Sequence, residues 1–435
     1  MKLEDDLTSG LNARYMPSVN RANSILPSRG PSQIQISGAE LKFVRDHLWQ
    51  AVEIISGSIM AVELFEAKIE MARNLYDLTE LIHAVELRLA DLGHPSSSGP
   101  KSQAIVRQFY GEESPSRMIA LAYTVTLPRV SDALADLLSR LSLADGPTLD
   151  VIEQGIRVVS PMLEWGERAL ILLEGDESES VRAGELRWRK GVLDYIEQDE
   201  CSDWNTVNRT RPLDARRDKR FITFYQTRDY SNAVSEIKER GGYYADRLEL
   251  CLINRDEIDA IETFSLVYFD LMYSVPIDML RDLARTAWDE ARHALLGHAL
   301  LTTNEVSGGL NPFDYPCSMI GITVRSKMGG WNALAQISMF GELNILKPMR
   351  QLASNARRRG DALTANTFEY IWLDESRHLK RMRSWLENHH PLRDLSLIED
   401  QTRSMAGRIL AEMGVVGEDY YVQLSASEIF SLLGE

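Results

Sequence analysis

Two short segments of the chain carry the same chemically active side chains in the same order. Residues 289–293 read Asp-Glu-Ala-Arg-His, and residues 374–378 read Asp-Glu-Ser-Arg-His. Both lie in stretches whose apolar periodicity predicts a helix. Because an α-helix turns by about 100° per residue, a Glu and a His three apart point within about 60° of one another. Each segment can therefore offer one carboxylate and one imidazole to a metal ion, from Glu290 and His293 in the first and Glu375 and His378 in the second.

An acidic residue three positions before a histidine is a weak signal by itself. With 8 histidines and 64 acidic residues, about one such match is expected by chance. Other matches in the chain are Glu80 with His83, Asp91 with His94 and Glu387 with His390. Only the two segments 289–293 and 374–378 share an Asp before the Glu and an Arg before the His. The repeated context, rather than the spacing, predicts a metal site.

Two further acids complete the predicted set of ligands. Glu262 lies 28 residues before Glu290, and Glu342 lies 33 residues before Glu375. Each interval suits one helix, a turn and the return to the same height in a bundle. Both acids interrupt mainly apolar helical faces, where an uncompensated carboxylate costs several kcal/mol. Two metal ions would neutralise them, and the alternative is pairing with arginines such as Arg285 or Arg350.

The residues beside the predicted ligands suggest a supporting layer. A histidine that binds a metal usually donates its other ring N–H to a carboxylate. Asp289 is placed to accept from His378, and Asp374 from His293, across the bundle. Arg292 and Arg377 could then hold these aspartates. The alternative for all four residues is ordinary surface ion pairing.

The 435 residues are too many for one ordinary domain, and the pattern predicts an all-α chain in five parts. These are a flexible arm (1–36), an N-terminal helical bundle without metal (37–175), an irregular connector (176–250), a four-helix di-metal bundle (251–390) and a C-terminal helical extension (391–435). The helices expected in the di-metal bundle span about 254–273, 276–302, 327–356 and 362–388. The connector holds a basic run at 211–220, which is either an anion or partner site or a salt-bridged surface.

The first bundle resembles the second along one helix. Residues 145–170 placed under 361–386 pair Asp145 with Asp361, Thr148 with Thr364 and Glu153 with Glu369. At that offset Glu375 and His378 fall on Val159 and Met162, so the first bundle would not hold the same metal. Shared helical periodicity is an alternative explanation of the match.

The composition of the chain disfavours some classes of binding partner. A net charge of −16 repels phosphate backbones and anionic membranes, so neither nucleic acid nor a membrane is expected. The three cysteines have no metal-ligand or redox spacing, which suits a reducing compartment. We expect a cytoplasmic protein because the first residues lack the apolar stretch of a signal peptide.

The doubled Asp-Glu-x-Arg-His resembles the ferritin-like di-iron carboxylate superfamily and its oxygen-activating branches. Within that superfamily, residues 257–262, 288–293 and 360–361 leading to 374–378 look most like uncharacterised ferritin-like proteins related to tRNA hydroxylases. It implies a four-helix bundle over about 254–390. It also implies that Glu262 and Glu342 are terminal ligands, that Glu290 and Glu375 bridge the metals, and that His293 and His378 each bind one ion.

The function implied is that of a non-haem di-iron oxidoreductase that activates O2. It would hydroxylate, desaturate, N-oxygenate or cleave a small organic substrate. The expected cofactor is two Fe ions, with Mn/Fe as the other pairing, O2 is the co-substrate, and a reductase or another electron donor is an expected partner. A homodimer is compatible with this interpretation. The alternatives are a ferroxidase or iron-handling protein, and a non-catalytic binding scaffold stabilised by metal.

Overall fold

The computed structural model describes residues 32–94, 104–141, 145–174, 187–194, 215–239, 242–302, 312–341 and 343–412. The chain forms two compact units. Unit 1 comprises residues 1–58 and 77–211, and unit 2 comprises residues 59–76 and 212–435. The segment 59–76, which the sequence placed in the first bundle, therefore belongs to the second unit.

Unit 1 is a helical bundle with an apolar interior. Its elements are α2 (Gln33–Ser58), the second part of α3 (Phe65–Asp91), α4 (Ala104–Gly111), α5 (Pro115–Ala120), the π-helix η2 (Leu121–Thr126), α6 (Leu127–Arg140) and α7 (Gly146–Glu174). Pro128 lies in the first turn of α6. The chain passes from α5 to α6 through the π-helical turns just before this proline, which lacks the N–H that a regular helix would need there.

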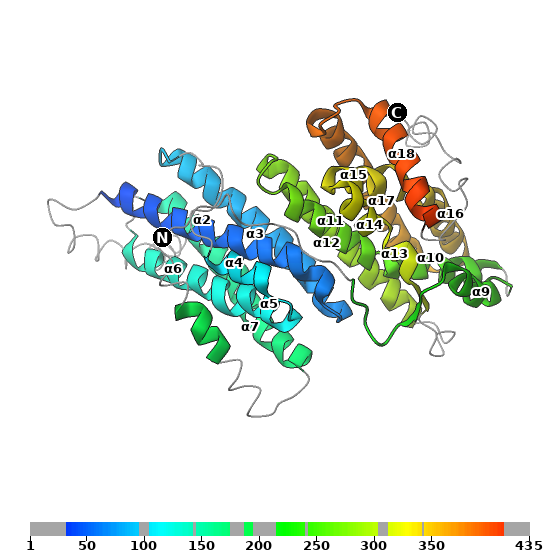
Figure 1. Cartoon of the computed structure of the whole chain (residues 1–435), viewed down its shortest axis with the longest axis horizontal. Coiled ribbons are helices and arrows are strands. Elements are labelled where there is room, and N and C mark those ends of the chain that lie inside the picture. Colours follow the sequence, from blue (N-terminus) through cyan, green and yellow to red (C-terminus); the bar gives the residue numbers. More distant parts are fainter. Residues whose placement is uncertain are drawn as a thin grey trace, which may run out of the picture. The chain divides into compact units, whose positions relative to one another are not determined.

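Unit 2 contains the first part of α3 and most of the remaining helices (Figure 1). Its first elements are η1 (Ile59–Ala61), β1 (Ile222–Phe224), α9 (Thr227–Lys238), α10 (Gly242–Asp256), α11 (Ile258–Leu271) and α12 (Ile277–Thr302). Then follow β2 (Pro312–Asp314), α13 (Tyr315–Ser318), α14 (Ile320–Met328), α15 (Gly330–Gln336), the π-helix η6 (Ile337–Gly341), α16 (Leu343–Arg359), α17 (Ala362–His389) and α18 (Leu395–Glu412). The short strands β1 and β2 pair in parallel, with Thr223 opposite Phe313.

Helices α10 and α11 both pack on α12, α16 packs on α17, and α12 packs on α17. The predicted all-α fold is confirmed, with one two-stranded sheet in the described part of the chain. The helices predicted at 276–302 and 362–388 are α12 and α17.

Three predicted segments differ from the structure. The helix expected at 327–356 is broken at Gly329, whose φ of 87° favours glycine, and again by the π-helix η6. The helix expected at 254–273 is interrupted at Glu257, between α10 and α11. The connector 176–250 is not wholly irregular, because it contains β1, α9 and most of α10. Nearly all of the arm lies outside the described residues, as do residues 413–435 of the predicted C-terminal extension.

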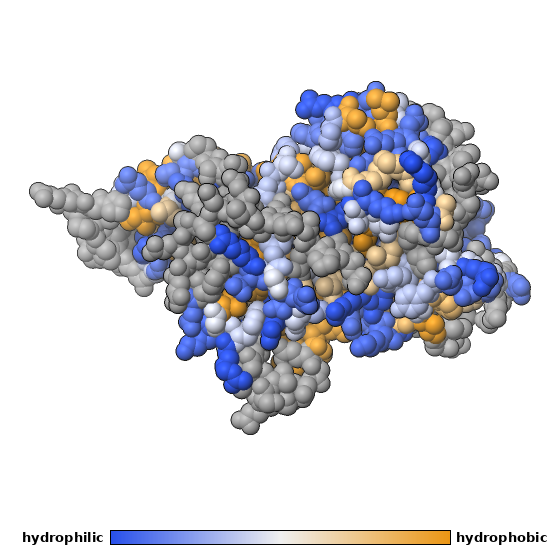
Figure 2. Space-filling view, viewed as in Figure 1, coloured by the Kyte–Doolittle hydropathy of each residue, from blue (hydrophilic) through white to orange (hydrophobic). Residues whose placement is uncertain are grey.

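On the face shown in Figure 2, hydrophilic residues cover most of the described surface, and hydrophobic residues form scattered patches. None of the described helices combines the length and the apolar character needed to cross a membrane.

Candidate metal centre

Four buried side chains meet where three elements of unit 2 come together. Glu290 and His293 come from α12, and Glu375 comes from α17. Glu257 comes from the turn between α10 and α11, where it precedes the first residue of α11. At least one atom of each lies within 4.8 Å of one atom from every other, and all four side chains are buried.

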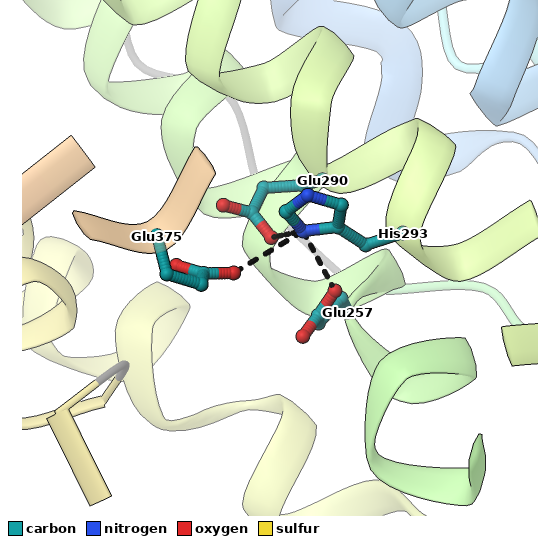
Figure 3. Close-up of side chains that lie close together, drawn as sticks. All are labelled: Glu257, Glu290, His293 and Glu375. Atoms are coloured by element: carbon teal, nitrogen blue, oxygen red, sulfur yellow. Dashed lines mark ion pairs between the residues drawn. The ribbon is translucent and has the colours of Figure 1, made fainter. Parts of the chain in front are cut away.

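The Nδ1 atom of His293 is the meeting point of three carboxylates. It lies 3.3 Å from Glu257 Oε2, 3.4 Å from Glu290 Oε2 and 3.1 Å from Glu375 Oε1. Figure 3 shows these three contacts converging on one ring nitrogen. Three oxygens around one nitrogen donor make a carboxylate-rich set of ligand atoms.

His378 faces the other oxygens of the same two helical glutamates. Its Nδ1 lies 3.0 Å from Glu290 Oε1 and 3.4 Å from Glu375 Oε2. Each of these glutamates therefore presents one oxygen to His293 and the other to His378. The ring centroids of the two histidines are 6.0 Å apart. A carboxylate with one oxygen toward each of two imidazoles has the orientation needed to bridge two metal ions.

The inward-facing atoms of this group lack hydrogen bonds. Buried atoms without a partner, within the described part of the chain, include Glu257 Oε2, Glu290 Oε1, both carboxylate oxygens of Glu375 and the Nδ1 atoms of His293 and His378. They lie close together but are not aligned for hydrogen bonding, which is unusual for buried polar atoms. Imidazole and carboxylate atoms are common ligands of iron, manganese and zinc. The residues present thus fit a metal centre.

The outer ring nitrogens face the aspartates of the doubled segment. His378 Nε2 lies 3.3 Å from Asp289 Oδ2, and His293 Nε2 lies 3.5 Å from Asp374 Oδ2. This is the crossed arrangement expected from the sequence. One arginine joins the two aspartates, because Arg292 Nη2 donates to Asp289 Oδ1 at 2.7 Å and to Asp374 Oδ2 at 2.5 Å.

The other two arginines near this layer contribute differently. Arg285 Nε donates to Asp289 Oδ1 at 2.9 Å, so it supports an aspartate of this layer. Arg377 Nη1 lies 3.5 Å from Asp374 Oδ1, and its side chain is 53% exposed. Arg292 is thus the main link between the two halves of the layer, and Arg377 is peripheral.

The charges of the centre shift its titration strongly. Burial lowers the pKa of His293, but the carboxylates of Asp374, Glu257, Glu290 and Glu375 outweigh it and hold this pKa well above the usual value. The pKa of His378 is raised for the same reason, against the effect of its burial. Protonated imidazoles supply positive charge among the buried carboxylates, and bound metal ions would supply the same compensation.

The carboxylates respond in opposite directions. Burial raises the pKa of Glu257 well above its usual range, and His293 offsets this only in part. Burial also raises the pKa of Glu375, but the two neighbouring histidines outweigh it and lower this pKa to about 2. The histidines therefore compensate Glu375 more fully than Glu257.

Glu262 does not join this group, and its prediction as a ligand is wrong. Its Oε1 accepts hydrogen bonds from the buried Lys68 Nζ and, at 2.7 Å, from Arg217 Nη1. The alternative of pairing with a cation is correct for this residue, although the partners are not those named from the sequence. These cations lie 194 and 45 residues away in the chain, so no local pattern points to them.

Glu257 takes the place expected for Glu262. Glu257 lies in the turn between α10 and α11 and reaches the centre, whereas Glu262 lies within α11 and pairs with Lys68 and Arg217. One sequence signal could have found Glu257, because it precedes Glu290 by 33 residues, the interval that separates Glu342 from Glu375. Glu342 itself lies outside the described residues.

The basic run in the connector is salt-bridged where it is described. Arg217 pairs with Glu262, while Arg220 pairs with Asp218 and Glu66. Lys219 lies 3.3 Å from Glu63. This segment therefore fastens residues 59–76 within unit 2 and compensates Glu262.

A cavity of about 450 Å³ opens onto the centre. Glu257 and Glu290 form part of its wall, and α9, α10, α11, α14 and η6 supply most of the rest. This volume falls in the range of small-molecule sites. A ligand in the cavity would lie beside two of the four clustered side chains.

No family model, no curated protein and no solved structure matches this chain. The centre is therefore interpreted from its own geometry.

Proposed function

We propose that unit 2 is a ferritin-like oxidoreductase in which two metal ions, bound by Glu257, Glu290, His293, Glu375 and His378, activate O2 for the oxidation of a small organic substrate. The observation that carries the proposal is the orientation of Glu290 and Glu375, each with one oxygen toward either histidine. Glu342 is proposed as the ligand that matches Glu257 in the second half of the bundle, because both precede their Glu-x-x-His by 33 residues. Two Fe ions, or an Mn/Fe pair, would supply the electrons that reduce O2.

The protein's own residues have separate roles in this proposal. Glu290, Glu375, His293 and His378 would hold the two ions. Asp289 and Asp374 orient the imidazoles, and Arg292 keeps both aspartates in position. The cavity admits the substrate next to Glu257 and Glu290, and its apolar side chains limit the access of water. A cavity of this size favours an organic substrate over iron storage.

The proposal is tested by loading the full chain anaerobically with Fe(II) and counting bound metal. We expect two ions per chain, and consumption of O2 when air is admitted. Glu290→Ala and Glu375→Ala should each remove at least one ion, because each takes an oxygen from both metal positions. Glu369→Ala is the matched control on α17, since this side chain is 47% exposed and pairs only with Arg357 in the described structure.

Three results would contradict the proposal. A wild-type chain that binds fewer than two ions has no two-metal centre. Unchanged binding in both glutamate variants would place the ions elsewhere. Uptake of many irons per chain would indicate an iron-handling protein instead.

A further inference from the structure

The cavity beside the candidate centre is lined by two chemically different kinds of side chain. Apolar side chains come mainly from α10, η6 and α16, with Leu252, Ile337, Phe340 and Ile345. Three carboxylates come from α10, α11 and β2, which are Asp256, Asp259 and Asp314. A ligand that contacts both kinds of side chain has an apolar body and a polar or charged end.

The three aspartates are poorly compensated by the protein. Asp256 pairs with Arg255 at 2.5 Å. Asp314 accepts hydrogen bonds from Thr227 Oγ1 at 3.2 Å and from the N–H of Cys317 at 3.5 Å, which are both uncharged donors. Neither Asp314 nor Asp259 has a cation within ion-pair distance among the described residues.

Arg217 does not fill this role. It acts on Asp259 electrostatically, but its guanidinium hydrogen bonds to Glu262 at 2.7 Å and to Ser318 at 3.0 Å. The lining of the cavity therefore holds more carboxylates than paired cations among the described residues, and a partly buried carboxylate without a counter-charge is unfavourable. A positively charged ligand would remove this imbalance.

The spacing of the aspartates favours an organic cation over a metal ion. A metal site needs at least three ligand atoms close to one another. Among the described residues, one group has such atoms within 4.8 Å of one another, and it consists of Glu257, Glu290, His293 and Glu375. The three aspartates do not form such a group, so they are spread too widely to surround one ion. An ammonium group can be held by one or two carboxylates, so it does not need all three to converge on one point. An anionic ligand would be repelled by the aspartates and by Glu257 and Glu290 at the inner end.

We propose that this cavity is the substrate site of the metal centre and that it selects an amine in its cationic form, with the ammonium group on Asp259 and Asp314 and an apolar body against Phe340 and Ile337. This inference rests on the proposed function, which it narrows to amines. The bound molecule reaches Glu257 and Glu290, so that part of its body lies beside the metal ligands.

The test compares three probes of similar shape, 2-phenylethylamine, 2-phenylethanol and 3-phenylpropionate, by calorimetric titration into the full chain at pH 7. The amine should bind at least tenfold more tightly than the alcohol, and the carboxylate should bind most weakly. Asp259→Asn should weaken binding of the amine at least tenfold and leave the alcohol unchanged. Asp278→Asn, an exposed position on α12, is the matched control and should change neither.

Equal affinity for amine and alcohol, or an amine affinity that Asp259→Asn leaves unchanged, overturns the inference. If circular dichroism shows that Asp259→Asn is unfolded, Asp314→Asn takes its place with the same expectation. Metal content measured in the same samples separates the two proposals. A chain that binds two metals without preferring the amine overturns only the inference, whereas one that prefers the amine but binds no metal overturns the proposed function.

Discussion

Helix α7 of unit 1 and helix α17 of unit 2 begin alike and differ in the middle. Asp145 precedes α7, where it accepts hydrogen bonds from Ser37 Oγ at 2.6 Å and from Arg88 Nη2 at 2.8 Å. The same arginine donates through Nε to Thr148 Oγ1 at 2.8 Å. An aspartate, a threonine three residues later, a hydroxyl and an arginine thus hold the start of this helix.

The start of α17 has the same parts. Asp361 accepts from Tyr243 OH at 2.6 Å and from the N–H of Thr364 at 3.1 Å. Arg247 Nε donates to Thr364 Oγ1 at 2.7 Å and lies 3.6 Å from Asp361 Oδ2. Asp361 accepts from a backbone N–H at the start of α17, and the negative charge of either aspartate is favourable beside the partial positive charge of a helix N-terminus. This shared cap accounts for two of the three identities between the two helices.

The middles of the two helices have opposite chemistry. Val159 and Met162 are 0% and 3% exposed in unit 1, and the matching positions in unit 2 are Glu375 and His378, at 0% and 1%. Two helices with the same residues at their N-termini can therefore bury an apolar face in one case and a charged face in the other. The charged face needs compensation from outside its own helix, which His293 and Glu290 of α12 supply in unit 2.

The largest expected effect comes from replacing the charged residues of α17 with the apolar residues found at the matching positions of α7. The double variant Glu375→Val/His378→Met should reduce metal content from two ions per chain to fewer than one. It removes a glutamate proposed to bind both ions and a histidine proposed to bind one of them. Metal analysis after gel filtration measures this. Glu369→Val on the same helix should retain both ions, and a double variant that still binds two would show that α17 is not part of the centre.

A smaller effect is expected for Glu262, a buried carboxylate that is compensated by two cationic side chains and not by a metal ion. Glu262→Gln should lower the free energy of unfolding by about 3 kcal/mol, because it leaves Lys68 and Arg217 buried without their partner. It should leave metal content unchanged. Urea denaturation of the metal-free chain measures the first effect.

Glu257→Gln should do the reverse in the same two assays, lowering metal content or affinity with less effect on the metal-free chain. If Glu262→Gln loses metal and Glu257→Gln keeps both ions, Glu262 is the ligand, as the sequence predicted, and Glu257 is not.

The smallest effect tests the shared cap. Asp145→Asn and Asp361→Asn should each lower the free energy of unfolding by about 1 kcal/mol at pH 7. Burial raises the pKa of both aspartates, but their hydrogen bonds outweigh it, so the folded pKa lies below the usual value of 3.8. Each carboxylate therefore stabilises the fold above that value, and the contribution is lost as the pH falls through the lowered pKa.

The difference between wild type and each variant should shrink below about pH 4, as urea denaturation at pH 7, 5 and 3.5 would show. Asp400→Asn, exposed on α18, should have little effect at any of these values. A cap that matters in one unit but not in the other would weaken the comparison between α7 and α17.

The sequence was sufficient for the parts of the site that depend on local geometry. Glu290 with His293, and Glu375 with His378, lie on regular helices, so a spacing of three residues places each pair on one face. The crossed positions of Asp289 and Asp374 follow from the same helical phase once the two helices face each other. The all-α fold and the extents of α12 and α17 follow from apolar periodicity in the same way.

The choice between Glu257 and Glu262 was a matter of tertiary structure. Both acids lie in the same predicted helix, and their local surroundings do not say which one turns inward. The break between α10 and α11 directs Glu257 to the centre, and Lys68 and Arg217, distant in sequence, bind Glu262. The face of a helix on which a residue lies depends on its spacing from residues a few positions away. The partner of a buried carboxylate depends on which distant segments the whole fold brings next to it.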